Sequence, residues 1–519
     1  MTQKGQTPTI NGRWWALAAL ALSMLTIGLD TTVLNVALPT LATELDASTG
    51  QLQWFGASYT LVLGALIIPM GGLGDRFGRK RLLLIGMAIF GASSAACALA
   101  TSAGVLIAAR AFQGIGGAAM MPLSMAMLPV LFRDPEERTR AMNIWVTCSA
   151  VGLPLGPIVG GWLLNHYAWG AVFLINVPLV AVGLLALTVY LPESRSERAQ
   201  PADGPGIVLS SAGLVAVIYG LIEAGQDGWT SASVLAPLLA GVALLAAFVG
   251  WERRSAHPIV DLALFSNRDF TVGTALSTVS NFALFGLLFV MPQYFQDIGG
   301  SDPLGTGVRL LPMIGGLIVA TRIGPMLVKR EGARFVIIAG LALSAAALGL
   351  AATTDVDTGY GFAALWITLL GGGIGLTMPA AMTTAIGALS TDRAGSGSGL
   401  LQALRQVGGT IGVAVLGTVL SSGYHARLDG GDVPASVEGA VRSSVGAGIE
   451  VAHRLDSSSL AETVRSAFVH AMDTVLLASA ALTILGAVIA VLCLPRRVAE
   501  TPAPTSPVHE PAREAVAVN

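Results

Sequence analysis

Two ionisable side chains lie well inside long apolar runs, and their types suit proton exchange. Asp30 lies in the run 14–38 and Arg110 in the run 104–129. A carboxylate at the centre of a bilayer costs about 2.5–3.5 kcal/mol on insertion scales, so it indicates a functional group that faces a cavity. A purely structural ion pair is the alternative explanation for Asp30.

The same two residues are expected at similar depth. Arg110 lies seven residues beyond a short turn near 101–103, and Asp30 lies nine residues before Pro39. At 1.5 Å per residue, both lie on the order of 10–14 Å below the same end of their helices. An arginine keeps its proton near neutral pH. Its expected role is therefore to change the proton affinity of Asp30 as the two side chains approach or separate.

Further polar residues are candidates for lining a cavity. Ser23 and Thr26 share a helix face with Asp30, and Gln113 continues the face of Arg110. The second half of the chain offers three more candidates on plausible inner faces: Asn281, Gln402 and Arg405.

Three of the remaining charged residues allow more than one explanation. Arg322 and Arg405 lie near helix ends, so each either contacts a substrate or extends to the membrane surface. Glu223 is expected at the external end of its helix, where a solvated carboxylate is the favoured explanation.

The elements that carry these residues are predicted membrane helices. Hydrophobic residues make up 53% of the chain, charged residues 12%, and the mean hydropathy is +0.71, which indicates an all-α polytopic membrane protein. Fourteen apolar runs are each long enough to span a bilayer: 14–38, 53–73, 82–100, 104–129, 141–164, 169–191, 205–223, 233–251, 270–292, 304–328, 335–352, 361–387, 399–422 and 472–494.

Charge placement predicts that both termini are cytoplasmic. With that orientation, nearly all Lys and Arg residues between the runs fall on the cytoplasmic side, as the positive-inside rule requires. The external exceptions all lie in one long segment, 423–471, where the rule has little force: Arg427, Arg442, Arg454 and Arg465. That segment contains amphipathic stretches that either lie on the membrane or cap the cavity.

Several other classes of protein are disfavoured. The three cysteines, Cys97, Cys148 and Cys493, have no paired spacing, so neither a disulfide framework nor a metal site is expected. No G-x-x-x-x-G-K-[ST] loop occurs, which disfavours an ATP-driven pump, and no H-E-x-x-H or G-x-S-x-G motif suggests a membrane enzyme. We expect no enzyme activity, no bound cofactor and no nucleic-acid partner.

The stretch 71–81, GGLGDRFGRKR, joins two runs with a tight, strongly charged turn. Glycine supplies backbone freedom, and Asp75 can pair with Arg76 or Arg79 to form a polar latch where two helix bundles meet. An ordinary positive-inside loop is the alternative. A degenerate copy recurs 254 residues later, where Gly332 takes the place of Gly78, and predicts two parallel halves.

The fifth run carries bare glycines at four-residue spacing, which let helices approach closely. Its segment GLPLGPIVGG contains Gly152, Pro154, Gly156, Pro157, Gly160 and Gly161.

Taken in order, these segments resemble the major facilitator superfamily, and in particular its fourteen-helix drug:proton antiporters. G-x-L-x-D-R-x-G-R-K resembles the loop motif between helices 2 and 3, matched by Gly71, Asp75, Arg76, Gly78 and Arg79. L-D-T-T-V-L-N-V-A-L-P resembles the helix 1 signature, and R-A-F-Q-G-I-G-G the helix 4 motif, whose arginine is implicated in proton transfer. The helix 5 glycines and prolines resemble the antiporter motif. The segment W-G-A-V-F-L-I-N-V-P departs from the family pattern at Gly170 and Ala171.

The resemblance implies two six-helix bundles with two inserted helices. The expected divisions are 1–13, a cytoplasmic N-terminus; 14–191 and 270–494, the bundles; 192–269, a linker with the inserted helices; and 495–519, a disordered cytoplasmic tail. It also implies multidrug efflux: export of hydrophobic small molecules such as drugs and antibiotics across the plasma membrane by a monomer, driven by the proton motive force. A dedicated exporter of one secondary metabolite, siderophore or lipid is the alternative.

Overall fold

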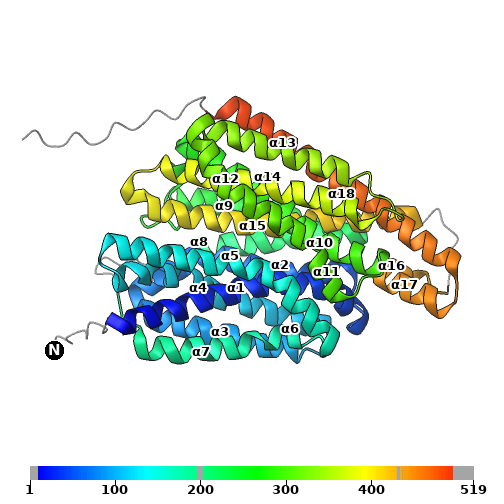
Figure 1. The fold of residues 1–519 in the computed structure, drawn as a ribbon, viewed down its shortest axis with the longest axis horizontal. Helices are drawn as coiled ribbons and strands as arrows, with labels where there is room; N and C mark the ends of the chain where they lie inside the picture. The colour runs from blue at the N-terminus through cyan, green and yellow to red at the C-terminus, as the bar shows by residue number, and fades with distance from the viewer. Residues whose placement is uncertain (1–9, 196–202, 429–432, 435, 495–519) are drawn as a thin grey trace, which may run out of the picture.

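The computed structural model describes residues 10–195, 203–428, 433–434 and 436–494, so the predicted tail 495–519 lies outside the described part. Figure 1 shows an all-helical molecule whose long helices run side by side. Among the described residues, thirteen helices are long and apolar enough to span a membrane, and the bent helix α5 makes a fourteenth span. The predicted polytopic all-α fold is therefore confirmed.

The N-terminal half contains six spans, and the sixth is broken into α6 and α7. Their bounds are α1 Ile10–Glu44, α2 Thr49–Phe77, α3 Arg79–Ala98, α4 Ala103–Leu131, α5 Pro135–His166, α6 Ala171–Leu174 and α7 Asn176–Tyr190. The first span starts four residues before the predicted boundary at Trp14. Helix α1 packs mainly on α5, and α4 packs on both α2 and α3.

Two inserted helices follow, α8 Gly204–Asp227 and α9 Ala232–Glu252. They pack on each other, and α8 also contacts α2 and α15, so the pair lies at the side of the seam between the two halves. Thr418 Oγ1 on α15 donates to Leu221 O on α8 over 2.6 Å. A short 3-10 helix, η1 Leu262–Ser266, leads into the second half.

The C-terminal half also contains six spans. Their bounds are α10 Arg268–Gln293 with the π-helix η2 Tyr294–Ile298, α11 Pro303–Arg309 with α12 Leu311–Glu331, α13 Ala333–Ala351, α14 Tyr360–Gly387, α15 Thr391–Leu428 and α18 Ser458–Cys493. Helix α14 packs on α12 and α13, and α15 packs on α10 and α18.

Helix α1 begins and α18 ends at the same end of the molecule, which we call the termini end, and we call the opposite end the far end. The turn from α2 to α3 lies at the termini end and centres on Gly78, with φ of +110°. The equivalent turn from α12 to α13 centres on Gly332, with φ of +88°. Both φ values favour glycine, and the two turns occupy matching places in the two halves, as the internal repeat predicts.

The segment 423–471 is more helical than predicted. Helix α15 continues to Leu428 and α18 already begins at Ser458, with α16 Glu438–Ser443 and α17 Val445–Arg454 between them. Thr49 Oγ1 on α2 donates to Ser443 O over 3.1 Å, so this segment contacts the N-terminal half at the far end. The amphipathic stretches expected in this segment fall in α17 and at the start of α18, and the neighbouring helices extend into it because the apolar runs mark only the membrane core of each helix.

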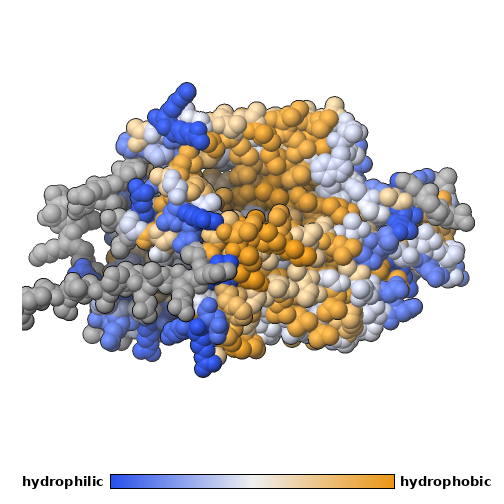
Figure 2. Space-filling model, turned by 90° about the horizontal axis from the view of Figure 1, so that it is seen from above, coloured by the Kyte–Doolittle hydropathy of each residue, from blue (hydrophilic) through white to orange (hydrophobic). Residues whose placement is uncertain are grey.

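The surface agrees with a membrane environment. Figure 2 shows a broad apolar band across one face, hollowed near its middle, with hydrophilic residues toward both ends of the long axis. Many large apolar side chains are exposed, including Leu185 at 71% and Leu239 at 68%. A face this apolar suits lipid contact.

Candidate functional site

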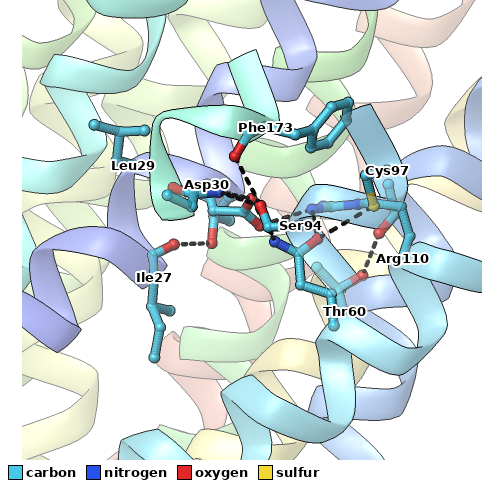
Figure 3. Close-up of polar contacts among 12 residues, drawn as sticks. Ile27, Leu29, Asp30, Thr60, Ser94, Cys97, Arg110 and Phe173 are labelled. Carbon is cyan, nitrogen blue, oxygen red and sulfur yellow. Dashed lines mark hydrogen bonds and ion pairs between the residues drawn. The ribbon is translucent and has the colours of Figure 1, made fainter. Parts of the chain in front are cut away.

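Asp30 and Arg110 form an ion pair in the interior of the N-terminal half. Arg110 Nη1 donates to Asp30 Oδ2 over 2.7 Å, and the two side chains are 1% and 0% exposed. Gln113 Nε2 and Asn176 Nδ2 each donate to the other oxygen, Oδ1, over 2.8 Å. The carboxylate on α1 is therefore bound by three donors from α4 and α7 (Figure 3).

The guanidinium of Arg110 also has hydrogen-bond and aromatic partners. Its Nε donates to Phe55 O on α2 over 3.1 Å, and Nη1 also donates to Gln113 Oε1 over 2.8 Å. Its Cζ lies 4.4 Å from the centroid of the Tyr59 ring, a favourable cation–π contact in a desolvated site. A buried charge needs such partners, because taking it out of water costs several kcal/mol.

Ser94 on α3 links the two amide side chains. Its Oγ donates to Phe173 O over 2.9 Å and accepts from Asn176 Nδ2 over 3.0 Å. Gln113 Nε2 lies 3.4 Å from the same Oγ. Four helices of the N-terminal half thus contribute side chains to one buried polar network around Asp30.

Sequence reasoning missed two members of this network, Ser94 and Asn176, and also the Tyr59 ring that packs on Arg110. Asn176 had a detectable signal, because it is a polar residue in an apolar run at the break between α6 and α7. Ser94 and Tyr59 had none, because small hydroxyl and aromatic residues are common in membrane helices.

Glycines on α4 bring α2 against Arg110. A Cβ at Gly114 would lie 2.6 Å from Tyr59 O, and one at Gly117 would lie 3.1 Å from Tyr59 Oη. Because real Cβ atoms essentially never approach within 3.0 Å, a side chain at Gly114 would push α2 away. The glycines of R-A-F-Q-G-I-G-G therefore let α2 pack closely on α4, which places the Tyr59 ring against Arg110.

The glycine ridge of α5 fixes α1 in the same way. A Cβ at Gly152 would lie 2.7 Å from Leu25 O, one at Gly156 2.9 Å from Leu29 O, and one at Gly160 2.6 Å from Val33 Cγ2. These glycines hold the backbone of α1 on both sides of Asp30. The side chain of Pro154 lies outside the described part.

Pro157 leaves a backbone acceptor that α1 satisfies. Proline has no N–H, so the carbonyl of Leu153 lacks its usual helical donor. Thr32 Oγ1 donates to Leu153 O over 3.0 Å, which joins α1 and α5 at the break. Helix α5 is bent by 42° between Leu153 and Leu155. Such a break is tolerated in a membrane when a neighbouring helix binds the freed group.

A small cavity lies where the network meets the C-terminal half. Its lining comes from both halves: Thr31, Leu34, Asn35, Leu38, Leu52, Gly56, Thr60, Arg110, Phe285, Phe289 and Val413. Its volume is about 20 Å³, room for about one water molecule. Arg110 borders this cavity, and Asp30 is not among its lining residues.

The other predicted lining residues lie elsewhere. Ser23 Oγ and Thr26 Oγ1 donate to carbonyls of their own helix, and Ser23 also faces Met87 on α3. Neither residue lines the cavity at Arg110. Asn281 Nδ2 on α10 donates to Arg405 O on α15 over 2.7 Å, so it joins two helices of the C-terminal half.

The charged turn at 71–81 makes its described contacts within the N-terminal half. Asp75 pairs with Arg79 over 2.8 Å, and Arg79 Nη1 lies 3.5 Å from Ala126 O on α4. Arg76 Cζ lies 5.3 Å from the Phe77 ring, and a Cβ at Gly71 would lie 3.8 Å from Pro122. The turn is also held by Glu193 beyond α7, whose carboxylate accepts from the backbone N–H groups of Lys80 and Arg81.

Two charged residues for which the sequence allowed more than one explanation differ in exposure. Arg322 on α12 is exposed, whereas Glu223 on α8 is half-buried.

The two halves meet at the far end beside α5. A Cβ at Gly161 on α5 would lie 2.6 Å from Leu304 Cα on α11, and Asn165 Nδ2 donates to Asp302 Oδ2. Gln296 Nε2 donates to Val36 O over 2.9 Å. Toward the termini end, side chains of α5 between Pro135 and Cys148 line a wide-open hollow of about 670 Å³.

Fourteen spans in two parallel halves around a seam with buried charges define a polytopic membrane transport protein. Residues 20–413 match the family model described as Major Facilitator Superfamily. The chain therefore belongs to the Major Facilitator Superfamily, whose members are transporters and not enzymes.

Relatives with assigned names are similar over most of the chain. The tetracenomycin C resistance and export protein of Streptomyces glaucescens is 36% identical, over 80% of this chain and 77% of its own length. The multidrug efflux pump LfrA of Mycolicibacterium smegmatis is 35% identical, over 89% of this chain and 92% of its own. The methyl viologen resistance protein SmvA of Salmonella typhimurium is 30% identical, over 92% and 97%.

Solved structures support the fold alone. An inward-facing, unoccupied bacterial homologue of the human lysosomal transporter Spinster matches with a TM-score of 0.68 and 18% identity. The match covers 95% of this chain and all of the solved chain.

Proposed function

We propose that this protein exports hydrophobic small molecules in exchange for protons. The observation that carries the proposal is the buried ion pair of Asp30 and Arg110 in the first half of a Major Facilitator transporter. Three donors bind the carboxylate oxygens while the pair is intact. A proton-coupled cycle needs one group that alternates between charged and neutral states, and Asp30 is our candidate.

Arg110 is the proposed link between protonation and the movement of the two halves. It borders the small cavity against Phe285 and Phe289 of α10, so a rearrangement of the seam reaches the guanidinium first. If the guanidinium moves away, the carboxylate loses its countercharge in a dry site and takes up a proton. Release of that proton then restores the pair. The energy source is the proton motive force, with no bound cofactor, and a monomer suffices.

We propose that the termini end is cytoplasmic. The positive-inside rule places the loops rich in Lys and Arg on this side. With that orientation, the wide-open hollow beside α5 faces the cytoplasm and the contacts between α5 and α11 close the outer side. Substrate would enter from the cytoplasm or the inner leaflet. The plasma membrane is then the expected location.

Aromatic drugs and antibiotics are the proposed substrates. This choice is supported by the relatives, because the names of three of them refer to tetracenomycin C, multiple drugs and methyl viologen. A dedicated exporter of one metabolite is the second candidate, and it is favoured by the relative that is named after a single antibiotic.

The experiment is a transport panel in inverted membrane vesicles that contain the full chain. A proton gradient, acid inside, should drive uptake of several unrelated fluorescent dyes, and a protonophore should abolish it. Uptake of one metabolite but no dye would support the dedicated exporter. Uptake that survives collapse of the gradient would contradict proton exchange.

A further inference from the structure

Two arginines inside the helical bundle have very different surroundings. Arg110 pairs with Asp30, whereas Arg405 on α15 has no carboxylate within ion-pair distance in the part of the chain that the structure describes. The Nε atom of Arg405 is buried and has no hydrogen-bond partner among those residues. A cation in a poorly solvated site is costly unless an anion or strong acceptors compensate it.

Weak acceptors occupy most of the contacts of Arg405. Its Nη1 lies 3.3 Å from Met382 Sδ and its Nη2 lies 3.1 Å from Met378 Sδ, both on α14. A thioether sulfur is a weak acceptor. The only strong acceptor bound by the guanidinium among the described residues is Gln402 Oε1, 3.1 Å from Nη1. Since a guanidinium carries five N–H donors, most of its capacity for strong hydrogen bonds is unused.

This group lies on the seam between the two halves. Gln402 Nε2 lies 3.7 Å from Met121 Sδ on α4, so the cluster touches the N-terminal half. Thr410, five residues after Arg405, hydrogen-bonds over 2.8 Å to Thr60, which lines the cavity at Arg110. At 1.5 Å per residue, Arg405 lies about 7.5 Å nearer the termini end than that cavity. A molecule entering from the termini end would reach Arg405 before it reached Arg110.

We propose that Arg405, Gln402 and the methionines Met121, Met378 and Met382 form a substrate subsite for an aromatic compound that carries an anionic oxygen. Phenolates, enolates and carboxylates are the chemical class. The proposal rests on the export function proposed above and adds the part of the substrate that the C-terminal half binds.

Each component suits that class of substrate. The guanidinium would exchange two thioether contacts for charge-assisted hydrogen bonds to the oxygen, which are about twice as strong as neutral ones. The amide of Gln402 can donate to the same ligand. The flexible, polarizable methionines can repack around an aromatic ring, with favourable sulfur–aromatic contacts.

The test compares an anionic and a cationic dye in the full chain, reconstituted in phosphatidylcholine vesicles. This lipid is zwitterionic, so no headgroup with a net negative charge competes with the dye for Arg405. Fluorescein is the anionic probe and rhodamine 6G the monocationic probe, and both are driven by an imposed proton gradient. The readout is the ratio of the two initial transport rates at equal protein levels.

Arg405→Gln should lower the anion-to-cation ratio at least tenfold, which corresponds to about 1.4 kcal/mol. Arg405→Lys keeps the positive charge but loses the planar guanidinium with its paired N–H donors. It should lower the anion-to-cation ratio by a smaller factor of about three. Arg454→Gln is the matched control, because Arg454 on α17 is exposed and pairs with Glu450 away from the seam. That control should leave the ratio within twofold of the wild type.

The outcomes separate this inference from the export function. Wild-type protein that transports neither dye in response to the gradient contradicts the proposed function itself. Wild-type protein that transports rhodamine 6G but excludes fluorescein overturns only the anionic subsite. An unchanged ratio in Arg405→Gln also overturns the subsite, and if that variant does not insert, an unchanged ratio in Arg405→Lys decides the same question.

Discussion

Arg110 Nη1 lies 2.7 Å from Asp30 Oδ2, yet of these two residues only Arg110 borders the small cavity between the two halves of the transporter. The carboxylate is enclosed by side chains of the N-terminal half, and the arginine is its contact with the seam. Movement of the C-terminal half can therefore reach the carboxylate through the arginine. The ion pair can therefore couple movement of the two halves to proton exchange at Asp30, and substitution of each residue in the network tests this coupling.

Removing Asn176 should impair transport without unfolding the protein. Asn176→Ala deletes one of the two amide donors to Asp30 Oδ1, and a hydrogen bond to a charged group contributes about 1.5–3 kcal/mol. Gradient-driven transport should fall roughly tenfold or more, since the carboxylate is no longer held in place. Ser23→Ala is the control, because the hydroxyl of Ser23 bonds within its own helix. Equal rates in the two variants would exclude Asn176 from the mechanism.

The glycine ridge should be intolerant of even one methyl group. Gly156→Ala would place a Cβ 2.9 Å from Leu29 O and force α1 away from α5, at a cost of roughly 1–3 kcal/mol. The thermal unfolding midpoint of the purified protein should therefore fall. Gly349→Ala in α13 is the matched control, because its Cβ would meet nothing within 4 Å and alanine favours a helix by about 0.5–1 kcal/mol. A ridge variant as stable as this control would contradict the packing argument.

The charged turn should affect turnover more than binding. In this arrangement Asp75 pairs with Arg79 inside the turn, and its described contacts lie in the N-terminal half. The prediction that it biases two conformations requires that Asp75→Asn slow transport several-fold while the dye Kd stays unchanged. Glu450→Gln, which breaks a comparable pair with Arg454 on α17, should change neither quantity. Wild-type turnover in Asp75→Asn would contradict this prediction and would indicate that the charged turn only sets the orientation of the helices in the membrane.

The sequence predicted the spans well because each carries a continuous apolar run, and a run long enough to cross the bilayer almost always forms a transmembrane helix in a membrane protein. It also predicted a similar depth for Asp30 and Arg110, because depth depends only on the residue count from a helix end. The functional roles of the two residues stay predictions.

Rotation of each helix about its own axis was much harder to predict. Ser23 and Thr26 share a face with Asp30 by spacing, yet they bond to their own helix and lie away from the cavity at Arg110. Asn176, which donates to Asp30, lies at the start of α7 just after the break that follows α6, and the position of this break has no clear signal in the apolar run. Glu193 binds the turn at 71–81 from a distant part of the chain, a contact that no local pattern encodes.

Substrate charge is a further prediction. Asp30 is bound by three donors and Arg405 adds uncompensated positive charge on the seam, so a dication finds little favourable contact there. We expect slower transport of methyl viologen, which carries two positive charges, than of a monocationic dye such as rhodamine 6G. Competition assays in inverted vesicles measure this preference. Methyl viologen transported as fast as the monocation would contradict it.

The most direct measurement concerns Asp30 itself. Asp30→Asn keeps the shape of the side chain but cannot exchange a proton, so uptake driven by an acid interior in inverted vesicles should fall to the level of protein-free vesicles. Arg110→Ala should also impair uptake, and the double variant should be no worse than the more affected single variant, because both residues act on one step. Protein levels and dye binding should be measured alongside. The account predicts no gradient-driven uptake by Asp30→Asn, and retained uptake at wild-type protein levels would contradict it and direct attention to Glu223.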